Sequence, residues 1–321
     1  MVSIFENTSH PVTVHIFHDD TLTDDNRQKF LRTAEKYSQQ VNLIDVSFYR
    51  DKIKKSIGAF LKFPIGTTYR SFIPDVLNNL EKVIYLDCDI VVNMDIYELW
   101  KIDLQNNSLA GVIDCQFYLE RDLLECFHVW FHLIGISLDK YINSGVLLMD
   151  LERVRKKLNM SYEFQKFIIR YRNLTRFVDQ DAINMLFKDD IKIIDARFNE
   201  YRLDKVDIAP ENCIIHAWAS KPFKKIAGHV SDRLYWKYYL KSAWGEHDTP
   251  EDLIKKICDI AAGIPEPTKQ KKSIFKSSIF YKTMRKASKK CSIEFRKIIA
   301  LCVKNIIYKL QYKSALKRLG S

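Results

Sequence analysis

The chain has 321 residues, of which 47% are apolar, and a formal net charge of +11. The apolar fraction excludes a disordered chain, and the length suits one large domain or two modest ones with a sizeable core. Seven irregularly spaced cysteines and the lack of a Cys-x-x-Cys pair argue against a disulfide framework and a structural zinc site. No signal peptide or apolar run of membrane-spanning length is visible, so we expect a cytoplasmic protein.

The positive charge is concentrated near the C-terminus. Residues 269–321 contain sixteen lysines and arginines against one acid, Glu294, and so carry +15. Residues 1–268 contain thirty-five basic and thirty-nine acidic residues, a net charge of −4. A mildly acidic body argues against an extended nucleic-acid surface, so we expect no nucleic-acid partner. The helix-stopping segment 263–268 predicts a linker between a domain at 1–262 and the basic tail at 269–321.

Apolar strands alternate with amphipathic helices along the domain. Strands are predicted over 12–18, 41–47, within 82–92, and over 110–114, 145–151, 191–194 and 213–215; helices are predicted over 23–37, 69–80, 152–171 and 181–187. Thr23 is the expected N-cap of the first of these helices. This alternation is typical of an α/β sandwich, and the continuous apolar runs favour a mostly parallel sheet.

The sharpest motif is Val-Ile-Tyr-Leu-Asp-Cys-Asp at 83–89, in which Asp87 and Asp89 follow an apolar run. In extended backbone, residues i and i+2 project to the same side. Ligands of open α/β sheets gather at the carboxyl ends of strands. Two oxygen ligands there would hold Mg²⁺ or Mn²⁺, ions that proteins usually share with substrate phosphates. The alternative is a strand that ends in a polar turn, because Asp-x-Asp by itself is common.

Three further segments strengthen the metal interpretation. A polar Asn-Ser-Gly turn at Asn143 precedes a buried strand, and Asp179 and Gln180 begin a helix, where an acidic N-terminus is also favoured by the helix dipole. His216 and Lys221 follow a buried strand and offer an imidazole for a metal and an ammonium for a phosphate. A lone histidine after a strand is more often structural.

Taken together and in this order, these segments resemble glycosyltransferase family 8, the retaining nucleotide-sugar transferases with a Rossmann-like GT-A fold, over about residues 3–245. The resemblance implies a UDP-sugar donor and Mn²⁺ (or Mg²⁺) as cofactor. It also implies transfer of glucose or galactose to a lipid-linked or cell-surface glycan. By position, Asp87, Asp89 and His216 would be the metal ligands; Arg70, Asp114, Asn143 and Lys221 would contact the donor; and Asp179 and Gln180 would lie beside the anomeric carbon.

Retention of configuration needs either a protein nucleophile or attack on the same face of the sugar. Gln180 is a poor nucleophile, because an amide oxygen is only weakly basic. We therefore expect same-face attack, with the leaving UDP phosphate helping to deprotonate the acceptor. Metal and lysine charges would stabilise that leaving group, while the sugar develops oxocarbenium character.

The chain departs from the family pattern in two places. Family members open with a strand and an aspartate-containing loop that hold the uridine, whereas residues 1–7 match the end of the helix that follows them. We therefore expect weakened UDP binding, and the alternative function is a catalytically impaired relative that binds glycan or acts as a scaffold. In the last motif, Ala219 takes the place of a glycine, and Lys221 comes one residue early.

Two other features call for an interpretation. His128 and His132 are spaced for a metal on one helix face, but their aromatic surroundings favour a packed or acceptor-contacting segment. In the tail, apolar residues at 295, 299, 302, 306 and 310 form one helical stripe flanked by lysines and arginines. A basic amphipathic helix of this kind predicts peripheral binding to an anionic membrane surface on its inner face. The alternatives are a solvated basic tail and an RNA-binding arm.

Overall fold

A computed structural model describes residues 1–58, 64–114, 135–171, 175, 177–200, 211–217, 221–224 and 230–261. The basic tail at 269–321, the linker, and the pair His128 and His132 lie outside these residues. Among the residues that are described, no helix is long and apolar enough to cross a bilayer.

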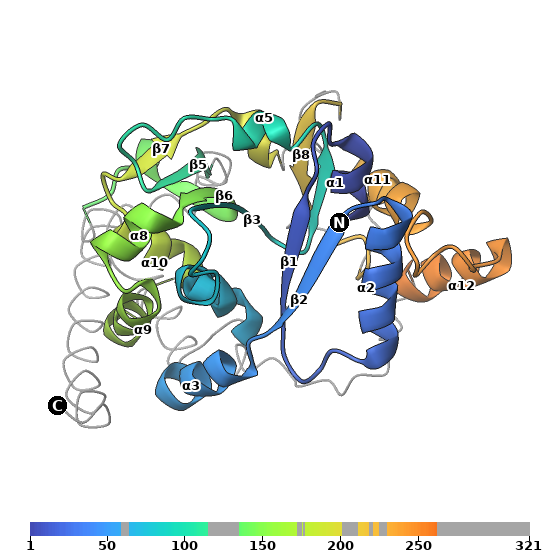
Figure 1. Cartoon of the computed structure of the whole chain (residues 1–321), viewed down its shortest axis with the longest axis horizontal. Coiled ribbons are helices and arrows are strands. Elements are labelled where there is room, and N and C mark those ends of the chain that lie inside the picture. Colours follow the sequence, from blue (N-terminus) through green and yellow to red (C-terminus); the bar gives the residue numbers. More distant parts are fainter. Residues whose placement is uncertain are drawn as a thin grey trace, which may run out of the picture.

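Helices and strands alternate along the chain (Figure 1). The strands are β1 (Thr13–His18), β2 (Gln40–Asp45), β3 (Lys82–Leu86), β4 (Ile90–Asn93), β5 (Leu109–Ile113), β6 (Ile142–Asp150), β7 (Ile191–Ile193) and β8 (Cys213–His216). The α-helices are α1 (Val2–Asn7), α2 (Asp24–Lys36), α3 (Ser47–Ile57), α4 (Ile73–Val76), α5 (Tyr97–Trp100), α8 (Leu151–Lys157), α9 (Met160–Tyr171), α10 (Val178–Leu186), α11 (Val230–Tyr239) and α12 (Pro250–Ala261). Short 3₁₀ helices are η2 (Ile65–Phe72), η3 (Leu138–Lys140) and η4 (Ala196–Asn199).

The strands form a mixed arrangement of sheets. A four-stranded sheet has the order β3-β6-β5-β7, in which β6 is antiparallel to both β3 and β5, and β7 is parallel to β5. Strands β1 and β2 pair in parallel, and β4 pairs with β8 antiparallel. The α/β class is therefore confirmed, but the expectation of a mostly parallel sheet is wrong. The continuous apolar run of β6 reflects burial on both faces, which an antiparallel central strand shares with a parallel one.

The four-stranded sheet is covered on both faces. Val146 and Leu148 of β6 pack on one face, with α1, α5 and the β4–β8 pair. Leu147 and Met149 pack on the other face, against α4, α8 and α10. These four side chains are fully buried, which is the period-two pattern of a central strand between two layers. This core fixes the position of the polar residues at the start of β6.

Most of the predicted elements match the structure, and the differences have local causes, whereas the helices α3, α5, α11 and α12 were not predicted. Thr23 caps α2 as expected, since its hydroxyl accepts from the backbone N–H of Asn26. The helix predicted over 152–171 is two helices, because Leu158 is extended and the Asn159 side chain caps the second one by accepting from the N–H of Tyr162.

Two other predicted segments also differ from the structure. The helix predicted over 69–80 ends at Val76, and its first part is the 3₁₀ helix η2. The expected turn at Asn143 lies inside β6, at a register shift in its pairing with β5.

Candidate active site

The carboxylates of the Asp-x-Asp motif lie where β3 gives way to β4. The N–H of Asp87 donates to the carbonyl of Gly145 on β6 over 2.8 Å, so the first carboxylate is tied to the central strand. The carbonyl of Asp89 accepts from the N–H of Ala217, just after β8, over 2.9 Å. Long-range backbone hydrogen bonds therefore bring three distant segments together at one point.

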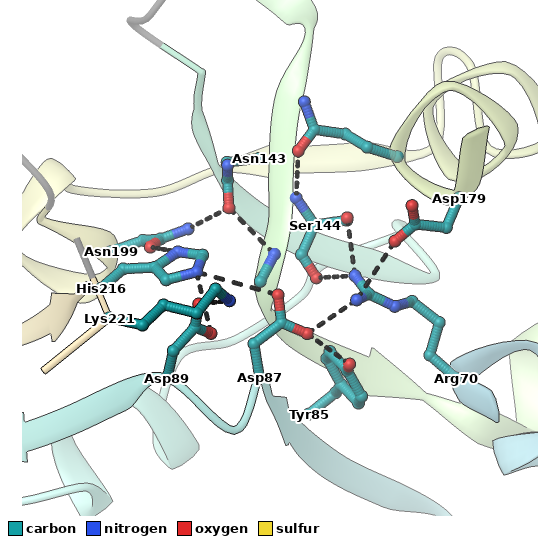
Figure 2. Close-up of polar contacts among 12 residues, drawn as sticks. Arg70, Tyr85, Asp87, Asp89, Asn143, Ser144, Asp179, Asn199, His216 and Lys221 are labelled. Carbon is teal, nitrogen blue, oxygen red and sulfur yellow. Dashed lines mark hydrogen bonds and ion pairs between the residues drawn. The ribbon is translucent and has the colours of Figure 1, made fainter. Parts of the chain in front are cut away.

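Asp87, Asp89 and His216 converge there (Figure 2), and their ligand atoms all lie within 4.8 Å of one another. Nε2 of His216 is 3.4 Å from Oδ1 of Asp89 and 3.8 Å from Oδ2 of Asp87. Octahedral ligands at about 2.1 Å from a cation are roughly 3 to 4 Å apart, so these separations suit one divalent ion. Two carboxylates and an imidazole are also a donor set that Mn²⁺ accepts.

Gly145 leaves the space that this cluster needs. A Cβ at this position would lie 2.3 Å from Cε1 of His216 and 3.0 Å from Oδ2 of Asp87. No side chain could occupy that space without displacing the imidazole. The glycine therefore lets the central strand approach the two candidate ligands closely.

Lys221 places a positive charge beside Asp89. Its ammonium donates to Oδ2 of Asp89, while 39% of the lysine side chain remains exposed. Burial would raise the pKa of the Asp89 carboxyl, but His216 and Lys221 outweigh burial and hold that pKa below its usual value. Asp89 is thus kept in the ionised form that a metal ligand requires.

Arg70 is buried behind the cluster and bridges several acceptors. It donates to the carbonyl and hydroxyl oxygens of Ser144 over 2.7 and 2.6 Å, and to Oδ1 of Asp87 over 2.7 Å. It also lies 3.1 Å from Oδ2 of Asp179. Desolvation would lower the pKa of the guanidinium, but Tyr85, Asp87 and Asp179 raise it. Arg70 is therefore a fixed cation that links the Asp-x-Asp motif to the first turn of α10.

The carboxyl of Asp179 lies on the other side of Arg70. Desolvation raises its pKa, and the arginine only partly opposes that effect.

Tyr85 donates its hydroxyl hydrogen to the same Asp87 oxygen that Arg70 contacts, and its ring lies under the guanidinium. The Asp87 carboxylate is consequently oriented by Arg70 and Tyr85 before any ligand arrives.

Gln180, Asn143 and Asp114 form a second polar group next to this cluster. The amide of Gln180 accepts from the N–H of Ser144 over 3.1 Å and donates to Oδ2 of Asp114 over 2.7 Å. Asn143 donates to the same Asp114 oxygen over 3.4 Å. Asp114 and Gln180 are almost fully buried. The structure thus brings together all the site residues that the sequence singled out, in one continuous polar region.

Asn199 is a site residue that the sequence reasoning missed. Its Oδ1 lies 3.0 Å from Nδ1 of His216, and its Nδ2 donates to Oδ1 of Asn143 over 2.9 Å (Figure 2). It follows Phe198 at the end of η4, in a segment without a recognisable motif. Asn199 comes six residues after the end of β7 and fourteen before the start of β8, so nothing in the local sequence marks it as a site residue.

The sequence is similar to several known proteins. The chain is 26% identical over 205 residues to general stress protein A of Bacillus subtilis, covering 62% of this chain and 66% of that one. It is 24% identical over 208 residues to the lipopolysaccharide 1,3-galactosyltransferase of Salmonella typhimurium, covering 61% and 56%. The chain thus spans less than two thirds of the length of these curated relatives.

The fold has clear counterparts among solved structures. The galactosyltransferase LgtC, solved in complex with donor and acceptor sugar analogues, superposes with a TM-score of 0.59 at 20% identity, covering 76% of this chain and all of LgtC. This likeness shows the GT-A fold. The sequence profile of Glycosyl transferase family 8 matches residues 1–227. Because that match covers well over half of the sequence, the chain belongs to glycosyltransferase family 8.

Proposed function

We propose that the chain is a metal-dependent, retaining hexosyltransferase that moves glucose or galactose from a UDP-sugar to a lipid-linked or cell-surface glycan. The observation that carries this proposal is the convergence of Asp87, Asp89 and His216 next to Arg70 and Asp179. A dense set of charged groups of this kind suits the departure of a diphosphate better than it suits a purely structural role.

The first task of the site is to hold the leaving group. Asp87, Asp89 and His216 would bind Mn²⁺ or Mg²⁺, which when bound neutralises the charge of a diphosphate. Lys221 lies outside any helix or strand, and its partly exposed side chain places its ammonium beside Asp89. We assign it to an oxygen of the same diphosphate.

The second task is to hold the donor sugar. Asp114 and Asn143 present a carboxylate and an amide from the ends of two neighbouring strands. These groups accept and donate hydrogen bonds, which is how proteins bind sugar hydroxyls. Asp114 accepts hydrogen bonds from both Gln180 and Asn143, and these bonds fix the orientation of the two groups so that they are preorganised for the donor.

The contacts of Gln180 favour same-face attack. Its amide oxygen accepts the N–H of Ser144, and its amide nitrogen donates to Asp114, so both ends are engaged in the folded protein. A weakly basic oxygen that already accepts a hydrogen bond is a poor nucleophile. We therefore assign Gln180 to positioning, and we assign deprotonation of the acceptor to the departing phosphate. A trapped glycosyl adduct on Asp179 or Gln180, seen by peptide mass spectrometry with a slow 2-fluoro donor, would overturn this assignment.

Two observations support a lipid-linked glycan as the acceptor: the activities named for similar proteins and the positive charge of the tail. One relative is a lipopolysaccharide galactosyltransferase, and one structural neighbour was solved with an acceptor sugar analogue. The tail at 269–321 carries +15 and would hold the enzyme at the cytoplasmic face of an anionic membrane. A lipid-linked glycan is the acceptor that this position makes available.

The proposal is tested by assaying UDP release from UDP-glucose and UDP-galactose with a panel of glycan acceptors. We expect release with Mn²⁺, and its loss after chelation and after Asp89→Asn. A protein that binds glycan but releases no UDP with any donor or metal would instead be the catalytically impaired relative. Calorimetry with UDP and Mn²⁺ separates the two outcomes further, because the impaired form binds UDP weakly or not at all.

A further inference from the structure

Asn199 lies where it can control the chemistry of His216 without itself reaching the substrate. It is 2% exposed, at the end of η4. The next residue, Glu200, is fixed to β8 on both sides: its N–H donates to the carbonyl of Ile214 over 2.7 Å, and its carbonyl accepts from the N–H of His216 over 2.9 Å. This backbone pairing holds Asn199 in register beside the imidazole.

The direction of each hydrogen bond around Asn199 follows from one backbone group. The N–H of Gly145 can only donate, and it lies 2.9 Å from Oδ1 of Asn143, so this side-chain atom must be the acceptor oxygen. The same oxygen is 2.9 Å from Nδ2 of Asn199, which must therefore be the amide nitrogen. The other end of the Asn199 amide, Oδ1, then faces Nδ1 of His216.

A second contact fixes the same orientation independently. The far end of the Asn143 amide lies 3.4 Å from an oxygen of Asp114, and a carboxylate pairs with the amide nitrogen. Asn143 is therefore oriented by a donor at one end and an acceptor at the other. The orientation of Asn199 follows from that of Asn143.

We propose that Asn199 is a positioning residue that holds the proton on Nδ1 of His216 and so makes Nε2 the ring atom that offers its lone pair to a cation held by Asp87 and Asp89. Its carbonyl oxygen can only accept, so the ring nitrogen that faces it carries the hydrogen. Nε2 lies 3.4 and 3.8 Å from the two carboxylates, where its lone pair completes the donor set. The inference rests on the proposed metal-binding role of these three residues, and it assigns the outer partner that orients the imidazole.

The same hydrogen bonds connect the metal cluster to the sugar-binding group. The path runs from His216 through Asn199 and Asn143 to Asp114. A change in the amide of Asn199 should therefore affect the metal and donor sides of the site differently. That difference distinguishes a positioning role from a loss of packing.

The first test examines the wild-type protein, and a variant serves only to assign its signals. Protein labelled with ¹⁵N at the histidine rings, metal-free and at about pH 8, is examined by long-range ¹H–¹⁵N correlation. The His216 signals are assigned from their loss in His216→Gln. We expect the chemical shift of a protonated Nδ1. A signal showing Nδ1 without its proton would overturn the proposal.

The second test measures Mn²⁺ binding by electron paramagnetic resonance. Asn199→Leu removes the acceptor, and we expect its affinity for Mn²⁺ to fall about 10- to 100-fold. Asn199→Asp keeps an acceptor for the Nδ1 proton, so we expect its affinity for Mn²⁺ to stay within about threefold of the wild-type affinity. Asn199→Asp also loses the donor to Asn143, and we expect its KM for the UDP-sugar to rise. Equal loss of Mn²⁺ affinity in both variants would overturn the proposal.

Ile214→Val provides the matched control for reduced stability. Ile214 is fully buried on β8, two residues from His216, and its side chain belongs to the apolar cluster of Val146 and Leu148. The substitution Ile214→Val should lower the free energy of unfolding by about 0.5–1.5 kcal/mol without changing the affinity for Mn²⁺. If wild-type protein binds no Mn²⁺ at all, the proposed function fails while the ring spectrum still decides the role of Asn199.

Discussion

A Cβ on Gly145 would lie 2.3 Å from Cε1 of His216, closer than any two such atoms can approach. The central strand and the imidazole therefore share a contact that only glycine permits, although the two residues are 71 positions apart in the sequence. The packing of the central strand therefore also determines where the imidazole lies relative to Asp87 and Asp89.

Gly145→Ala should displace His216 from the cluster and lower Mn²⁺ affinity by about tenfold or more. The matched control is Gly66→Ala, because a Cβ at that position has nothing within 4 Å. Titration of Mn²⁺ followed by electron paramagnetic resonance measures both variants. Wild-type affinity in Gly145→Ala would show that the ring can move without cost, against this interpretation.

Arg70 should be essential for stability as well as for the site. Arg70→Met leaves the partly buried Asp87 and Asp179 near each other without their shared cation, and loss of one partner from a buried ion pair costs up to about 3–5 kcal/mol. Arg32→Met, on the exposed face of α2, should stay within about 0.5 kcal/mol. Urea unfolding measures both free energies. Near-equal values for the two variants would contradict the bridging role.

Asp19, beside Tyr69, should make stability depend on pH in the acid range. Burial would raise the pKa of this carboxyl, but hydrogen bonds from Thr21 and Tyr69 outweigh burial and lower the pKa to about 2. In the unfolded chain the pKa is about 3.9. A lowered folded pKa stabilises the protein above about pH 4, and this contribution is lost as the pH falls towards about 2.

Comparison with Asp19→Asn isolates that contribution. We expect the wild type to exceed the variant in free energy of unfolding by about 1 kcal/mol at neutral pH, after solvent screening, and by much less near pH 2. Urea unfolding across this range measures the difference. A gap between the two proteins that does not change with pH would refute the assigned cause.

Deletion of 269–321 should release the protein from anionic vesicles. Lysines and arginines near such a surface contribute about 1 kcal/mol each at most, and this segment contains sixteen of them. Sedimentation with phosphatidylserine-containing vesicles measures binding, and neutral phosphatidylcholine vesicles are the control. UDP release should be unchanged by the deletion. Undiminished vesicle binding by the truncated protein would exclude the tail as the anchor.

The sequence predicts well that the two aspartates and His216 lie together, because its pattern is local. Asp87 and Asp89 follow an apolar strand, and His216 follows another. Because functional residues of α/β sheets gather at the carboxyl ends of strands, this pattern already predicts that the three residues are neighbours. The Asp179-Gln180 pair is equally visible as the first turn of a helix. In the structure these residues do come together, in contact with Arg70 and Asp114.

What the sequence does not reveal depends on long-range pairing. Asn199 is placed by the bonds between Glu200 and β8, which no local pattern encodes. The direction of β6 is likewise invisible, since burial on both faces gives the same apolar run for either direction. The break at Leu158 was hidden because residues 151–171 keep a helical spacing of apolar positions on both sides of it.

The proposed transferase activity depends most directly on a single cation shared by Asp87, Asp89 and His216. Crystals grown with Mn²⁺ and UDP, and measured near the manganese absorption edge, would locate that ion by its anomalous scattering. We predict one strong peak within bonding distance, about 2.0–2.3 Å, of an oxygen from each aspartate and of Nε2 of His216. A manganese peak elsewhere, or an ordered UDP diphosphate with no metal between it and these three residues, would contradict the account.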